Sequence, residues 1–259
     1  MKIGIFTSFQ NNKIVKQAIE SCKSIGVDYE VVDIINENWL DNVRNSDCDG
    51  FFCPSNCISQ ELKTIQDERY YFVSQVMKRP IYPDFNGLYI HENKRNMAAW
   101  LELNNYAHAK TKVFTNIENA INYLSDCEYP IVTKANVGAA ASKVRIIKNK
   151  RKAIRMAKKC LPKKFIFKLL SLGLFYKTKV GFLNLPDLHN PQKDYFIVQD
   201  FVKDILWEWR ILKIGDSYFG HQKLLEGQFA SGSGKVGWVA PPQHLLEMVR
   251  ELCQKGGFR

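Results

Sequence analysis

Lys134 and the small residues that follow it form the segment of this sequence best suited to chemistry. Residues 129–134 read as a strand, residues 135–142 have the loop sequence ANVGAAAS, and residues 144–147 read as a returning strand. Small residues let backbone N–H groups approach phosphate oxygens, and a lysine supplies a compact positive charge. The sequence has neither a GxxxxGK[ST] pattern nor a GxGxxG after its first strand. The segment predicts a phosphate-binding loop of another type, with an ordinary hairpin as the alternative.

Charged residues also recur on two later strands. The sequence VQDFV at 198–202 is followed by Glu208-Trp-Arg210 and then by a strand that carries Lys223. Because successive side chains of a strand point to opposite faces, Glu208, Arg210 and Leu212 share one face. A carboxylate, a guanidinium and a lysine on one sheet face suit an anionic, metal-bound substrate. A solvated sheet face is the alternative.

The elements that position these residues fall into two groups. The first group predicts strands at 2–7, 29–34 and 50–53, alternating with helices at 11–25, 37–46 and 59–77. This β-α-β order is typical of a parallel sheet. The turn-rich sequence RPIYPDFNG at 79–87 marks a boundary.

The second group is mixed. We expect helices at 92–104, 117–126, 150–160 and from Pro241-Pro242 to about Lys255, and further strands at 112–114, 195–201, 208–214 and 218–225. Gly215-Asp216 suits a hairpin turn between the last two strands. The expected organisation is an α/β protein with one domain at 1–85 and another at 86–259. The second domain divides into residues 90–160, an insertion at 161–193, and residues 194–259.

Composition narrows the function classes. The 259 residues have a net charge of +11, with 46% hydrophobic and 24% charged residues, which is ordinary globular usage. Residues 129–186 contain 15 lysines and arginines and no acidic residue, which leaves the rest of the chain at −4. One strongly positive segment indicates a polyanionic partner. No apolar run is long enough to span a membrane, the start is too short for a signal peptide, and the seven cysteines read as reduced thiols. We therefore expect a cytoplasmic protein.

Taken in order, the motifs resemble the ATP-grasp superfamily, in particular its RimK-type carboxylate–amine ligases. The motifs are ENKR at 92–95, YPIVTKANVG at 129–138, VQDFV at 198–202, Glu208-Trp-Arg210 and FASGSG at 229–234. The resemblance covers residues 80–259, and residues 1–85 resemble the Rossmann-like domain that often precedes an ATP-grasp region. The last motif resembles a branch associated with bacterial surface-polysaccharide genes.

The resemblance implies a role for individual residues. It implies that Lys94 and Lys134 contact the phosphates and adenine of ATP, and that Arg210 and Lys223 lie near the γ-phosphate and an acyl phosphate. It leaves open whether Asp204 or Glu208 reaches the ribose or the reaction centre. The implied phosphate loop comprises Asn136, Gly138, Ala139, Ala140, Ala141 and Ser142, and the implied adenine hinge comprises Gln199, Asp200, Phe201 and Val202.

The implied activity is ATP-dependent joining of a carboxylate to an amine or thiol through an acyl phosphate, with Mg²⁺ as cofactor and release of ADP. The sequence departs from the family pattern in three places. The Asp and Glu-x-Asn strands that hold Mg²⁺ in the family have no match after Lys223, so we expect these ligands beyond Arg259; the alternative is a protein that does not hold metal in this way. Ala139-Ala-Ala141 replaces Gly-Ser-Gly in the phosphate loop, and no arginine stands between Phe229 and Ala230.

Other partners are suggested by single features. The resemblance implies a substrate linked to a cell-surface glycan, and a homo-oligomer is compatible with the sequence. The basic and apolar sequence at 163–179 fits an anionic membrane surface, with packing on its own domain or a partner subunit as the alternative. The basic segment also raises nucleic acid as a less favoured partner, because it lacks interleaved aromatic residues outside 163–179. A catalytically incomplete ATP-binding module is the other rival function.

Overall fold

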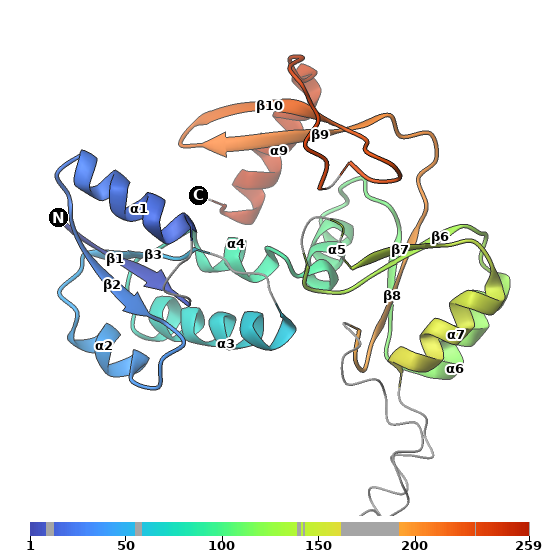
Figure 1. Ribbon diagram of the computed structural model, residues 1–259, viewed down its shortest axis with the longest axis horizontal. Coiled ribbons are helices and arrows are strands. Elements are labelled where there is room, and N and C mark those ends of the chain that lie inside the picture. The colour runs from blue at the N-terminus through green and yellow to red at the C-terminus, as the bar shows by residue number, and fades with distance from the viewer. Residues whose placement is uncertain are drawn as a thin grey trace, which may run out of the picture. The chain divides into compact units, whose positions relative to one another are not determined.

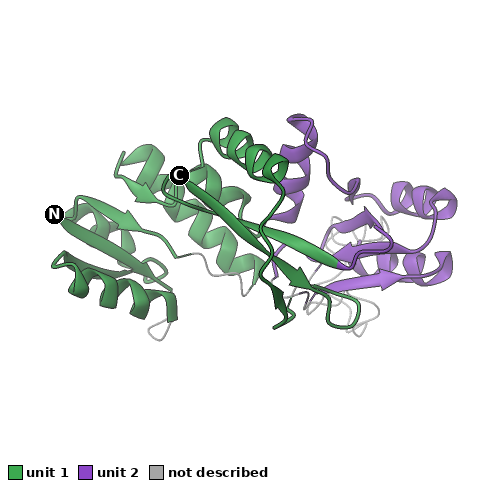
Figure 2. Cartoon of the chain, turned by 90° about the horizontal axis from the view of Figure 1, so that it is seen from above, with its two compact units in different colours: residues 1–92, 207–259 green, residues 93–206 purple. Residues whose placement is uncertain are grey.

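The computed structural model describes residues 1–8, 13–54, 59–138, 141, 143–161, 192–230 and 232–258. The chain divides into two compact units, one formed by residues 1–92 and 207–259 and the other by residues 93–206 (Figure 2). The domain limits expected from the sequence, 1–85 and 86–259, stay predictions. No described helix is both long and apolar enough to cross a membrane.

The N-terminal region contains the expected parallel sheet, with strand order β2-β1-β3-β4. Its strands are β1 (Lys2–Thr7), β2 (Asp28–Asp33), β3 (Gly50–Phe52) and β4 (Ile81–Tyr82). In Figure 1, α1 (Lys13–Ser24) lies on one side of this sheet, and α2 (Trp39–Asn45) and α3 (Gln60–Tyr71) lie on the other. The rings of Phe6 and Phe51 stack at 4.7 Å in the core beneath α3. The β-α-β interpretation of this region is confirmed.

One local expectation in this region was wrong. The turn-rich stretch contains β4 and the start of α4 (Phe85–Ile90), because the backbone N–H groups of Phe51 and Cys53 donate to Pro80 O and Tyr82 O at 2.9 and 2.7 Å. The side chain of Asp84 caps α4. The helix expected at 59–77 is present as α3, which continues directly into a π-helical turn, η1 (Phe72–Val76).

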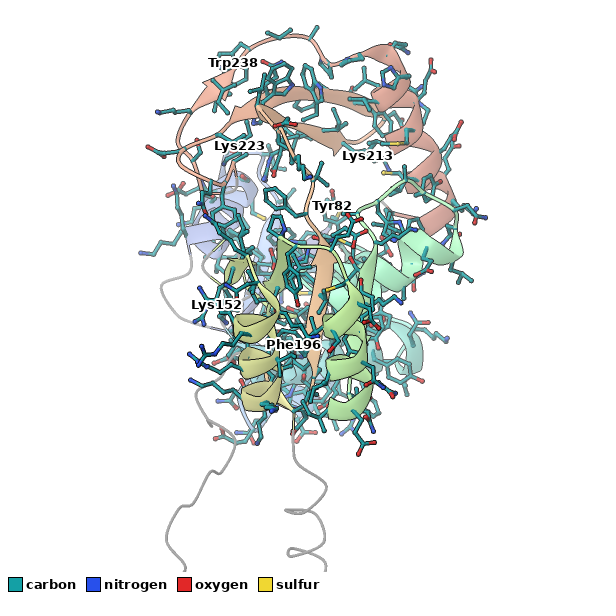
Figure 3. The ribbon with its side chains drawn as sticks, turned by 90° about the vertical axis from the view of Figure 1, so that its right-hand side faces the viewer. Tyr82, Lys152, Phe196, Lys213, Lys223 and Trp238 are labelled. Carbon is teal, nitrogen blue, oxygen red and sulfur yellow. The ribbon has the colours of Figure 1, made fainter. Side chains whose placement is uncertain are left out.

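The 93–206 unit is built on an antiparallel sheet with strand order β5-β8-β6-β7. The strands are β5 (Thr111–Phe114), β6 (Ile131–Lys134), β7 (Val144–Ile147) and β8 (Phe196–Asp200). One face packs against α6 (Ile117–Asp126) and α7 (Lys150–Cys160), with Ile131, Ile147, Phe196 and Val198 buried between them. Phe196 lies between the two helices in Figure 3. The unit also contains α5 (Lys94–Leu103).

Residues 207–258 form a second antiparallel sheet, with strand order β11-β10-β9. Strands β9 (Trp207–Ile214) and β10 (Ser217–Leu224) form the expected hairpin, and β11 (Val236–Gly237) adds a short edge strand. Gly215 in the turn has φ of 55°, a conformation that favours glycine. Helix α9 (Gln243–Gly256) begins after Pro242 and ends at Gly257, whose φ is 64°. Pro242 and Gly257 thus bound this helix as the sequence indicated.

Candidate functional site

The sheet of the 93–206 unit has a second face, opposite α6 and α7, that carries Lys134. The strand register places Thr111 and Val132 on either side of Gln199, and alternation sends all three side chains to this face. We call it the Lys134 face. Its members are Thr111, Val113, Val132, Lys134, Val144, Ile146, Ile197 and Gln199. The face therefore combines an apolar centre with one cation.

Lys134 is half-buried and bonded to a neutral partner. Its amino group donates to Gln199 Oε1 at 2.8 Å, while Gln199 Nε2 donates to Thr111 Oγ1 at 2.7 Å and to Ala109 O at 3.3 Å. Gln199 is therefore held with its carbonyl oxygen toward the lysine. Burial lowers the pKa of Lys134, and the positive charge of Lys94 lowers it further. A positively charged site that is partly removed from water and faces a second cation favours an anionic ligand.

Lys94 is placed by the N-terminus of α5 and by the end of β6. Its backbone N–H donates to Asn136 O at 3.2 Å, and its amino group donates to Gly138 O at 2.7 Å. The next residue, Arg95, donates its backbone N–H to Asn136 Oδ1 at 2.9 Å. These contacts join Asn136 and Gly138, in the segment that follows β6, to the start of the helix that bears Lys94.

Asn136 is the centre of this junction and is fully buried. Its backbone N–H donates to the hydroxyl of Tyr195 at 2.8 Å, and the Arg95 guanidinium lies 4.8 Å from the centre of the Tyr195 ring. The sequence-based role of Asn136 in covering phosphate stays a prediction. The structure places its side-chain oxygen against α5, where it positions Lys94 relative to Lys134.

The expected phosphate loop is described only in part. Ala135 N donates to Lys143 O at 3.2 Å and Val144 N donates to Ala141 O at 3.0 Å, which closes the hairpin. Gly138 has φ of 152°, and a Cβ there would lie 3.0 Å from Lys143 Cδ, so a larger residue would be strained. Ala141 has φ of 57°. Ala139, Ala140 and Ser142 lie outside the described residues.

The expected hinge begins on β8 and continues beyond it. Gln199 and Asp200 are the last two residues of the strand, and Asp200 N donates to Lys110 O at 3.0 Å. Phe201 and Val202 follow the strand, and Val202 is exposed. Among the described residues, no backbone partner is found for the N–H groups of Phe201 and Val202. Asp204 is exposed, with φ of 57°.

Glu208, Arg210 and Lys223 lie in the other unit, on the hairpin of β9 and β10. Register pairs Glu208 with Lys223 and Arg210 with His221. Alternation gives these four residues one face, together with Leu212 and Phe219, as expected for Glu208, Arg210 and Leu212. We call it the Arg210 face. The opposite face meets α9, because Lys213 Nζ donates to Phe258 O at 2.8 Å and Arg250 stacks at 5.1 Å on Tyr218. Lys213 and Lys223 are labelled in Figure 3.

The described residues contain one cluster of three possible metal ligands, and its surroundings do not suit Mg²⁺. Their single cluster of possible metal ligands is Glu30, Asp47 and Cys48, which is in the N-terminal region. The amino group of Lys2 lies 3.2 Å from Glu30 Oε2 and also contacts Asp47. A lysine therefore already pairs with both carboxylates and offsets part of their charge, so the cluster does not suit a divalent cation.

The sequence analysis did not identify several residues of the Lys134 site. Tyr195 and Arg95 clamp Asn136, while Gln192 Nε2 donates to Thr133 Oγ1 at 2.9 Å and Gln192 Oε1 accepts from Ile197 N at 3.0 Å. The Arg95–Asn136, Tyr195–Asn136 and Gln192–Thr133 pairs are about 40 to 60 positions apart, whereas Gln192 and Ile197 are 5 apart. The tertiary fold brings the distant pairs together, so local patterns gave no signal for them.

Comparisons with known proteins identify the fold. No protein-family model and no curated protein matches the sequence. The RimK-domain ATP-grasp protein of Sphaerobacter thermophilus is similar in structure, with a TM-score of 0.62 and 10% identity over 100% of this chain and 83% of that one. The macrocyclase MdnC of Microcystis aeruginosa, solved with its precursor peptide MdnA, has a TM-score of 0.58 and 12% identity over 100% and 84% of the two chains.

A third structure agrees with these two. The D-alanine–D-alanine ligase of Bacillus anthracis, solved with ATP, has a TM-score of 0.56 and 15% identity over 99% of this chain and 77% of that one. The α/β interpretation is therefore confirmed, and the chain has the fold of the ATP-grasp ligases.

Proposed function

We propose that this protein is an ATP-dependent carboxylate–amine ligase whose nucleotide site is the Lys134 face. The observation that carries the proposal is the pairing of Lys134 with the neutral Gln199 oxygen, beside Lys94. Phosphate oxygens would supply the negative charge that Lys134 lacks in its partner Gln199. Val132, Val113 and Ile146 give the same face an apolar area that suits the adenine ring.

The backbone groups that follow β8 are suited to hydrogen bonding with the edge of adenine. The N–H groups of Phe201 and Val202 have no backbone partner among the described residues, and Gln199 at the end of β8 already contacts Lys134. Peptide N–H and C=O groups of an extended segment can donate to and accept from a base edge. We therefore propose that residues 199–202 bind adenine and that Lys94 and Lys134 bind phosphates.

The proposed reaction has two balanced steps. A carboxylate oxygen attacks the γ-phosphorus of ATP, and ADP leaves as the acyl phosphate forms. The amine nitrogen then attacks the acyl carbon, phosphate leaves, and the nitrogen loses a proton. Arg210 and Lys223 are the proposed groups that offset charge on the transferred phosphoryl group, and Glu208 is the proposed proton acceptor. Mg²⁺ would supply further charge neutralisation at the phosphates.

Binding of ATP tests the nucleotide site directly. We expect calorimetry to show that Lys134→Ala weakens ATP binding by roughly 10- to 100-fold, the range of a lost charge-assisted hydrogen bond. Lys112→Ala is the matched control, because Lys112 is on β5 of the same sheet but faces α6, where its amino group lies 4.6 Å from the Tyr123 ring. Equal losses in both variants would contradict the proposed site.

Release of ADP tests the ligase reaction separately. We expect ADP release that requires a carboxylate substrate, and hydroxylamine should trap the acyl phosphate as a hydroxamate. Arg210→Ala should slow this release while ATP binding at Lys134 is retained. ATP binding without ADP release under any substrate would instead favour the ATP-binding module.

We further propose that the substrate is linked to a cell-surface glycan. The support is the FASGSG sequence at 229–234 and the exposed ring of Trp238, which is 85% accessible and lies 5.5 Å from His221 of the Arg210 face. Exposed tryptophan rings are suited to packing on sugar rings. A Trp238→Ala variant should raise the KM for a glycan-linked substrate and leave the KM for ATP unchanged.

A further inference from the structure

Helix α7 carries an unusual charge pattern that the proposed ligase site does not use. Its buried side chains are Ala153, Ala157 and Cys160, which pack on the sheet of the 93–206 unit. All of its lysines and arginines are exposed, as is Lys148 just before it. The exposed cations are Lys148, Lys150, Arg151, Lys152, Arg155, Lys158 and Lys159. In Figure 3, Lys152 points away from the body of its unit.

This pattern opposes the stability of the helix in two ways. The first turn contains Lys150, Arg151 and Lys152 and no acidic residue, although the partial positive charge at a helix N-terminus favours acidic side chains. Arg155 also stands four residues from Arg151 and from Lys159, and like charges at this spacing repel each other. Among the described residues, no ion pair involves a cation of α7.

An uncompensated charge of this size favours a partner that supplies many negative charges. Two features favour a lipid surface over a nucleic acid. The exposed side of α7 has no aromatic residue on which a base can stack. The sequence that continues the chain, 163–179, contains apolar residues interspersed with lysines and no acidic residue, a composition suited to lipid headgroups and acyl chains.

We propose that the exposed face of α7 docks on an anionic lipid surface. Lys152, Arg155 and Lys159 lie on one side of the helix, since they are three and four residues apart. Each cation near such a surface contributes to binding, and the attraction weakens with salt. The inference is independent of the ligase proposal, because α7 packs on the opposite side of the sheet from Lys134.

Vesicle co-sedimentation of the full chain tests the proposal. We expect binding to phosphatidylcholine vesicles that contain phosphatidylglycerol, no binding to phosphatidylcholine alone, and loss of binding at high salt. The triple variant Lys152→Gln, Arg155→Gln, Lys159→Gln should lower the affinity by roughly 100-fold, given the contribution of each cation at an anionic surface.

A second triple variant provides the matched control. Lys13, Lys16 and Lys23 are exposed on α1, so changing them to Gln removes the same net charge from another helix. This variant should bind vesicles nearly as well as the wild type. The α7 variant should also unfold at a higher urea concentration than the wild type, because the repulsion is relieved.

Three results would overturn the proposal. Equal binding by both triple variants would assign any lipid affinity to another part of the chain. Displacement from vesicles by inorganic phosphate, beyond that by chloride at equal ionic strength, would indicate a free-phosphate site. Tighter binding of duplex DNA than of vesicles, lost in the α7 variant alone, would assign the face to nucleic acid.

Discussion

Two regions of this protein each bury a lysine side chain at least in part. One lysine has a charged hydrogen-bond partner and the other has a neutral one. In the N-terminal region, Lys63 on α3 is 3% exposed, bonds the carboxylate of Asp67 and donates to Leu88 O at 2.9 Å. In the 93–206 unit, Lys134 is half-buried and bonds the neutral oxygen of Gln199. The charge of a lysine with a carboxylate partner is balanced within the protein. A lysine with an amide partner keeps its full charge for a ligand.

The largest expected effect is on the N-terminal region. Lys63→Met leaves Asp67 without its counter-ion in a site where burial already raises the pKa of this carboxyl. We expect a loss of about 3–5 kcal/mol in the free energy of unfolding, the usual cost of an uncompensated buried charge. Urea unfolding monitored by circular dichroism measures it.

A double variant separates the charge from the packing. Lys63→Met combined with Asp67→Leu removes both charges, so most of the stability should return. A single Lys63→Met variant as stable as the wild type would show that Lys63 and Lys134 do not differ as described.

A smaller effect, on ATP affinity, is expected when Lys134 is given a carboxylate partner like that of Lys63. Gln199→Glu places a carboxylate beside Lys134 and should raise the pKa of this lysine. ATP affinity should then fall about tenfold, which corresponds to about 1.4 kcal/mol, because the carboxylate repels phosphate and already neutralises Lys134. Calorimetric titration with ATP measures the loss.

Gln199→Leu is the control for this change, because it removes the hydrogen bonds to Lys134 and Thr111 without adding charge. We expect it to reduce ATP affinity less than Gln199→Glu does. An equal reduction would mean that ATP affinity depends on how Gln199 positions Lys134 and not on whether the charge of Lys134 is neutralised.

The sequence anticipated the parts of this comparison that depend on local pattern. Strand β7 and helices α6 and α7 lie at the residues expected, and Lys134 ends its strand as predicted. These elements follow from alternation, amphipathic spacing and asparagine caps, which are local. The clamp around Asn136 depends on Tyr195, which is 59 residues away. The Lys63–Asp67 pair has ordinary helical spacing, and only its burial distinguishes it from a surface pair.

The smallest expected effect is a pH dependence that belongs to Lys134 alone. Its pKa in the folded chain is lowered from 10.5 by burial and by Lys94, so the unfolded chain binds more protons between the lowered pKa and 10.5. The free energy of unfolding should therefore rise with pH in this window by a contribution that a Lys134→Met variant lacks. The difference between the two proteins in urea unfolding, followed from neutral pH to 10.5, isolates this contribution from other titrating groups. A difference that stays constant with pH would mean that Lys134 is as well solvated as a surface lysine, and the contrast with Lys63 would then rest on Asp67 alone.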